Sequence, residues 1–209
     1  MAIIKKGILG GFSGKAGTVV GYELNGQDVM RGLPKQRIKP FTAGELQNQK
    51  TFGELQAWLR PITTFLRVGF QNYAPTFQGF TAAKSYNSKH AIVKDDAGTY
   101  IDPALALVSF GDQAKSTTAS AVSETSNSVT FNWQGGEHKY DDRAMFLIYD
   151  IENGNAEFDT AAVKRSAMTG KFNMGRDFSG KSVHVYLAFV AEDRKTRSNS
   201  QYLGIVNVL

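Results

Sequence analysis

The stretch Ser128-Val129-Thr130-Phe131-Asn132-Trp133 decides the fold, because polar and apolar residues alternate along it without a break. Successive side chains of a β-strand point to opposite faces, so one face of this strand carries Val129, Phe131 and Trp133. The alternation of Val183, Val185, Leu187 and Phe189 in 182–192 repeats the pattern. Both stretches therefore predict strands that pack one apolar face on a core.

Further strands are expected on either side of these two. Gly, Asn, Asp and Ser clusters separate them, which is typical of the turns in a β-sandwich. The strands that we expect are 99–110, 127–134, 143–151, 155–160, 170–175, 182–192 and 198–208. Alternation along these strands predicts that Phe131, Trp133, Tyr186 and Phe189 are buried.

The final strand is apolar on both faces, with Leu203 and Ile205 on one and Val206 and Val208 on the other. A strand with two apolar faces is normally covered on both sides. We therefore expect this strand to be paired along its length, with the sandwich interior on one side. The helical segment or the arm of a neighbouring subunit would cover the other side.

Residues from about 122 to 209 resemble a fibronectin type III or similar immunoglobulin-like module. The resemblance rests on Trp133 on an early strand, on Tyr186 in its apolar strand, and on Ser198-Asn199-Ser200-Gln201-Tyr202 opening the last strand. It implies an immunoglobulin-like β-sandwich and brings no activity with it.

The whole chain also resembles a large uncharacterised Bacteroidetes family that carries a domain-of-unknown-function label. The pattern Gly-x-x-Gly-x-x-Ser-Gly-Lys-x-Gly-x-Val-Val-Gly over 7–21, followed by Arg31-x-x-Pro34, carries this resemblance. Tyr86-Asn87 after Ser85, and Asp102 after Tyr100-Ile101, also match it. The resemblance implies a lineage and a shared architecture, without an activity.

A glycine-rich arm precedes the rest of the chain, with eight glycines in the first 32 residues. Asn25-Gly26 is a preferred pair for a type I′ turn, so 18–24 and 27–33 are expected to form a hairpin. An isolated hairpin is marginally stable in water. This one must pair with a further strand, in its own chain or in a neighbour.

The pattern becomes helical after the basic connector from Pro34 to Pro40. Thr42 and Glu45 match a capping box, and Pro61 is expected to kink the helix or to start a second one. The expected apolar stripe consists of Leu46, Phe52, Leu55, Leu59, Ile62 and Leu66. A further short helix is expected over 81–92, where Ala82, Ala83 and Tyr86 would dock on the first helix. The predicted fold class is α+β, mostly β, with an arm at 1–40, a helical segment at 41–98 and a β-sandwich at 99–209.

Composition limits the classes of function. The 209 residues include no cysteine, which excludes disulfides, thiolate metal sites and cysteine nucleophiles. No stretch approaches the length of about 18 apolar residues that spans a bilayer. No secretion signal is recognisable, so we expect synthesis in the cytoplasm and a final location that is open, an extracellular or virion-like assembly included. Seven Lys or Arg and two acids lie in 1–40, so the net charge of +5 belongs to the arm.

No motif supports catalysis or a cofactor. Gly14-Lys15 lacks the Ser or Thr and the strand–loop–helix context of a phosphate-binding loop. His138 with Glu137, Asp141 and Asp142 is better interpreted as a solvated turn than as a metal site, because spacing alone is not a ligand set. Asp95-Asp96 is typical of a turn, and the aromatic residues interleaved with basic ones over 60–80 are typical of a helical core. We therefore expect no enzyme activity, cofactor, metal or small-molecule substrate.

The leading hypothesis is a structural protein that self-assembles by strand pairing into a filament, sheath, pilus-like or virion-like particle, because exposed edge strands invite pairing with another chain. The expected interface consists of Ile8, Leu9, Phe12, Val19, Val20, Tyr22, Val29, Met30, Ile205, Val206 and Val208. The alternative is a nucleic-acid-associated protein whose basic arm contacts phosphates. Its contacts would be Lys5, Lys6, Lys15, Arg31, Lys35, Arg37 and Lys39. A carbohydrate- or ligand-binding sandwich module rests on fold analogy alone.

Overall fold

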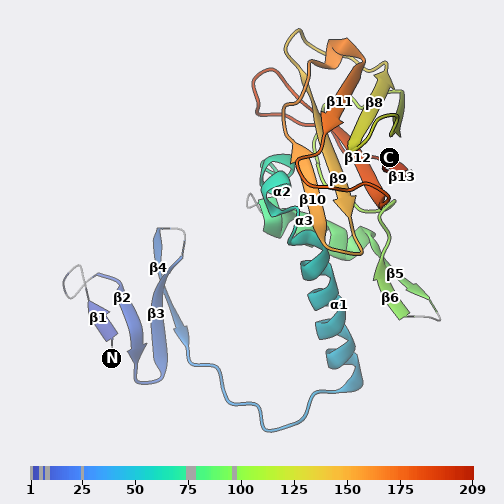
Figure 1. The fold of residues 1–209 in the computed structure, drawn as a ribbon. Coiled ribbons are helices and arrows are strands. Elements are labelled where there is room, and N and C mark those ends of the chain that lie inside the picture. The colour runs from blue at the N-terminus through green and yellow to red at the C-terminus, as the bar shows by residue number, and fades with distance from the viewer. Residues whose placement is uncertain (1, 5–6, 8–9, 25, 74–78, 96–97) are drawn as a thin grey trace. The chain divides into compact units, whose positions relative to one another are not determined.

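The computed structural model describes residues 2–4, 7, 10–24, 26–73, 79–95 and 98–209 (Figure 1). The chain divides into two compact units, Met1–Ala43 and Gly44–Leu209. Strands outnumber helices among the described residues, which contain three α-helices, so the predicted mostly-β fold class is confirmed. No helix of the described part is long and apolar enough to cross a membrane.

The first unit is one antiparallel sheet in the order β1-β2-β3-β4. Its strands are β1 (Ala2–Ile4), β2 (Phe12–Ala16), β3 (Val19–Leu24) and β4 (Gln27–Gly32). Leu24 pairs with Gln27, which leaves a two-residue turn, and Gly26 in it has the positive φ of 79° that such a turn needs. The expected hairpin is therefore present, and it extends by two strands of its own chain. Asn25 lies outside the described residues.

Three helices open the second unit: α1 (Ala43–Leu59), α2 (Thr63–Gly69) and α3 (Gly79–His90). α1 begins directly after Thr42, the predicted cap. Pro61 separates α1 from α2, because proline lacks the N–H that would continue the helical ladder. α3 packs on α2, with Ala82 and Ala83 fully buried.

The prediction of an apolar stripe along α1 is correct for only half of its residues in this helix. Leu55 and Leu59 are buried, whereas Leu46 and Phe52 are about half exposed, at 52% and 51%. Figure 1 shows the first turns of α1 extending away from the sheets, so that only its last turns pack on them. Lys84 Nζ lies 4.4 Å from the centre of the Phe52 ring and partly covers it.

Two sheets follow the helices, a four-stranded one in the order β10-β9-β12-β13 and a three-stranded one in the order β11-β8-β7. Their strands are β7 (Thr118–Val122), β8 (Ser128–Gln134), β9 (Arg143–Asp150), β10 (Asn155–Asp159), β11 (Thr169–Asn173), β12 (Ser182–Val190) and β13 (Gln201–Asn207). A separate hairpin joins β5 (Ile92–Asp95) to β6 (Gly98–Ile101).

The expected strand 99–110 is wrong beyond Ile101. Residues 102–110 are irregular because other groups bind their backbone. The buried side chain of Asn87 donates to Leu107 O and accepts from Leu107 N, and the Ser200 hydroxyl accepts from Val108 N at 3.0 Å. These bonds replace the partner strand that the apolar residues of the segment suggested.

Two hydrophobic cores lie on opposite faces of the four-stranded sheet. Phe131, Trp133 and Phe189 are buried between the two sheets, as predicted. Tyr186 is also buried, but it points to the other core, where Tyr149 and the helices pack. β9 and β12 are therefore covered on both faces, which makes them the central strands of a three-layer arrangement of helices, sheet and sheet (Figure 1).

The C-terminal strand is paired along its length, as predicted, but the reason for its two apolar faces differs. Tyr202 pairs with Tyr186 and Ile205 with His184, so β13 carries one extra residue between these pairs. Gly204, with φ of 96°, lies in this bulge. The bulge turns Leu203 and Val206 toward the same core and leaves Ile205 60% exposed, so the expectation of cover on both faces is wrong.

Candidate assembly interface and surface pockets

The N-terminal sheet is a single layer whose register defines two faces. Cross-strand partners point to the same face, so Lys15, Val20 and Arg31, which pair in a row, share one face. Tyr22 and Val29 pair on this face as well. The face thus carries an apolar strip with a cation on each side of Val20, and all of these side chains are half-buried or exposed.

The opposite face is built around Gly21, the one buried residue among those described in this unit. A Cβ at Gly21 would clash with the Phe12 ring, which lies across the glycine. Gly14 and Met30 flank Gly21 in register, and Met30 is 65% exposed. Among the described residues of this unit, neither face of the sheet therefore has an interior of its own.

Both outer strands of this sheet, β1 and β4, have an edge without a partner strand among the described residues of their unit. Leu33 N donates to Thr18 O at 2.8 Å, and hydrogen-bonded pairs alternate along an antiparallel ladder. Asp28, Met30 and Gly32 therefore turn their backbone N–H and C=O groups outward. Such an edge is a template for another strand.

The structure separates the expected interface residues into three groups. Phe12, Val19, Val20, Tyr22, Val29 and Met30 lie in the N-terminal sheet. Val206 and Val208 belong to the core between the sheets, with 7% and 3% exposed, so they offer no surface to a neighbour. Ile205 is exposed through the β13 bulge. Ile8 and Leu9 lie outside the described residues.

The expected phosphate contacts also differ among themselves. Lys15 and Arg31 lie on the sheet, and Lys35 and Lys39 are exposed on the connector. Arg37 donates from Nε to Lys39 O and from Nη2 to Pro40 O, and its guanidinium lies 4.4 Å above the Phe41 ring. Lys5 and Lys6 lie outside the described residues.

The motifs considered for chemistry are structural elements. Phe12–Ala16, which contains Gly14-Lys15, is the strand β2 and therefore no phosphate loop. Asp142 is buried and accepts from Gln113 Nε2, Lys139 N and Glu192 N, all at 2.8–2.9 Å. Across the described ranges, no group of three or more His, Asp or Glu side chains is arranged to hold a metal.

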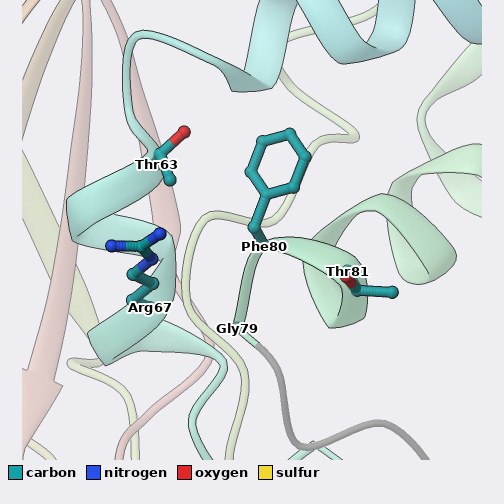
Figure 2. Close-up of a pocket in the computed structure, with 5 residues that line it drawn as sticks. All are labelled: Thr63, Arg67, Gly79, Phe80 and Thr81. Carbon is teal, nitrogen blue, oxygen red and sulfur yellow. The ribbon is translucent and has the colours of Figure 1, made fainter. Parts of the chain in front are cut away.

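An open pocket of about 480 Å³ lies between α2 and α3, and Figure 2 shows five residues that line it. Among the five described residues that line it, Arg67 is the one cation and Phe80 the one aromatic residue, and none has a carboxylate or an imidazole. The Thr63 hydroxyl donates to Arg60 O at 2.7 Å. These lining residues therefore supply no acid–base pair.

A second hollow, of about 660 Å³, lies between α1, β6 and the turn from β9 to β10. Trp58, Tyr100 and Tyr149 line it together with Glu54 and Glu152. Burial, followed by the charge of Asp150, raises the pKa of Tyr149 to about 12, so its hydroxyl is neutral and donates to Trp58 O at 2.7 Å. Sequence reasoning missed this hollow because its residues come from three distant segments without a shared motif.

The comparisons with known proteins give a match to a family of unknown function. A family model described as "Family of unknown function (DUF6266)" matches residues 11–204. No curated protein and no solved structure matches the chain.

Proposed function

The chain belongs to the family of unknown function DUF6266, and we propose that it is a non-enzymatic structural protein that self-assembles through its N-terminal sheet. The observation that carries this proposal is a four-stranded sheet whose described residues leave both outer edges without a partner strand and form no core. A filament, sheath, pilus-like or virion-like particle is the kind of product that such pairing gives.

The physical argument is that the described part of this sheet has no core and no partner strand at its outer edges. A stable sheet needs a hydrophobic face packed on another layer. Here Val20, Tyr22 and Val29 form an apolar strip that a second copy can cover, and the outward backbone groups of β4 can accept a further strand. When sheets from different copies pair, the apolar strip is covered and the outward backbone groups of β4 gain hydrogen-bond partners.

We also propose that the sandwich is of the immunoglobulin-like kind and that the family lineage is that of Bacteroidetes. The antiparallel three-stranded and four-stranded sheets, with Trp133 between them, support an immunoglobulin-like sandwich. The glycine pattern over 7–21 supports the lineage. Neither the sandwich nor the lineage indicates a ligand. A ligand-binding function would therefore rest on analogy with the fold alone.

Deleting residues 1–33 tests the proposed function. We expect the full chain to form large particles in light scattering and negative-stain images, and the truncated chain to be a folded monomer, because both cores lie in Gly44–Leu209. A point variant sharpens this test. Val29→Asp places a charge on the apolar strip and should also dissociate the particles, whereas Ser120→Asp, on an exposed position of β7, should not. Unchanged particle size after the deletion would refute the proposal.

Nucleic-acid binding is the second candidate, favoured by Lys15 and Arg31 lying on one face with Val20 between them. Affinity that depends on phosphate contacts falls steeply as salt rises. Particles that persist from low to high salt without nucleic acid support assembly. Retention of nucleic acid at low salt, lost at high salt together with the particles, would instead favour the alternative.

A further inference from the structure

The hollow between α1, β6 and the β9–β10 turn is acidic. Among the described residues that line it, Glu54 and Glu152 are the charged ones, and none is Lys or Arg. Lys50 Nζ lies 3.9 Å from Glu54 Oε1, but both side chains of this i,i+4 pair are exposed to solvent. Solvent weakens the attraction between the charges of such a pair. Both carboxylates are thus accessible to a cation that enters the hollow.

Three aromatic side chains, Trp58, Tyr100 and Tyr149, form part of its wall. Tyr100 on β6 is 48% exposed, and Trp58 packs edge-on against Tyr149 with ring centres 5.4 Å apart. A cation is attracted to the face of an aromatic ring, most strongly where carboxylates are close by. The chemistry of the hollow suits a lysine or arginine side chain.

The connector 34–40 offers such side chains in a suitable arrangement. Its structure has no helix or strand, and prolines at both ends favour an extended chain. Lys35 and Lys39 lie within this short connector, four residues apart. Both are exposed, and residues 1–40 carry seven basic and two acidic side chains.

We propose that the acidic hollow of one copy binds Lys35 and Lys39 of the connector of a second copy. The inference rests on the proposed self-assembly, to which it adds a second contact besides strand pairing. Charge complementarity selects this partner, since the basic connector is matched by a hollow whose two described charged residues, Glu54 and Glu152, are carboxylates.

Cysteine trapping tests this contact, because the chain has no cysteine of its own. Ala57→Cys places a thiol on the exposed wall of the hollow, and Ile38→Cys places one on the connector beside Lys39. We expect the two full-length variants, mixed and oxidised, to give a disulfide-linked dimer of both chains on a non-reducing gel. The control Ser120→Cys, on the exposed face of β7, should give at least five-fold less dimer with Ile38→Cys.

Charge variants show whether the carboxylates cause the contact. Glu54→Gln combined with Glu152→Gln should lower the yield of trapped dimer several-fold, and the pair Glu124→Gln and Glu137→Gln, exposed elsewhere, should leave it unchanged. An equal yield with both pairs would overturn the proposal.

The remaining outcomes separate this proposal from the proposed function. Particles that form normally while the mixture gives no more dimer than the control would overturn the contact alone. A chain with both Ile38→Cys and Ala57→Cys that closes within itself at high dilution, when the mixture does not cross-link, would assign the connector to its own hollow and overturn the contact between copies. A monomeric full-length chain would overturn both proposals.

Discussion

Single polar side chains hold much of the irregular backbone of the second unit. Asn87 is fully buried on α3 and binds Ala83 O and both backbone groups of Leu107. Arg165 is 1% exposed, donates from Nη1 to Ala114 O at 2.7 Å, and lies 4.0 Å over the Phe189 ring. Both side chains form hydrogen bonds with backbone groups that no neighbouring strand pairs. These bonds matter because a buried polar group without a hydrogen-bond partner costs about 1–3 kcal/mol.

Trp133 allows a prediction at this scale. Trp133→Ala should lower the free energy of unfolding by about 3–5 kcal/mol, as large aromatic deletions in cores do. The residue is 2% exposed, and its indole N–H donates to Arg165 O at 2.8 Å, so the variant loses packing and a buried hydrogen bond. Urea unfolding measures the change, with Tyr140→Ala, 78% exposed, as the control. A loss below about 1 kcal/mol would place Trp133 among surface residues.

At the scale of elements, the sequence predicts those strands whose alternation is strong. β8 and β12 alternate cleanly and were found within two residues of their ends. β7 was missed because its sequence, Thr-Ala-Ser-Ala-Val, contains small residues that give little contrast between faces. Residues 102–110 were assigned to a strand because apolar content does not reveal that Asn87 and Ser200 take the place of a partner strand.

The β13 bulge shows the same limit, since it reverses the alternation on which strand prediction depends. Gly204→Ala should lower the free energy of unfolding by about 1 kcal/mol or more, because its φ of 96° strains any residue with a Cβ. Gly44→Ala, in α1 with no atom near its Cβ position, is the matched control and should be neutral or slightly stabilising. Thermal unfolding of both variants compares the two. Equal effects would mean that the bulge tolerates a side chain.

At the scale of the whole molecule, apolar burial is unequally distributed. Every residue of both hydrophobic cores belongs to Gly44–Leu209, and none of the described residues of Met1–Ala43 contributes to either. The hairpin signal at Asn25-Gly26 was enough to predict that the arm is only marginally stable by itself. It did not predict the acidic hollow, because only the fold brings Glu54, Tyr100 and Glu152 together.

Amide hydrogen exchange of the full chain tests this unequal distribution directly. A sheet without a core opens easily, so 19–24 and 27–32 should exchange fast in dilute, dissociated protein and slowly in particles, where strands from other copies pair with them. The C-terminal strand is the internal control, because β13 pairs with β12, and Val208 N donates to Lys181 O at 2.9 Å within one chain. Its amides should be protected in both states, although chain ends normally exchange freely. Exchange at 201–208 as fast as in the dissociated arm would refute the role of β13 in the fold. Arm amides whose protection stays the same upon assembly would refute strand pairing as the contact between copies.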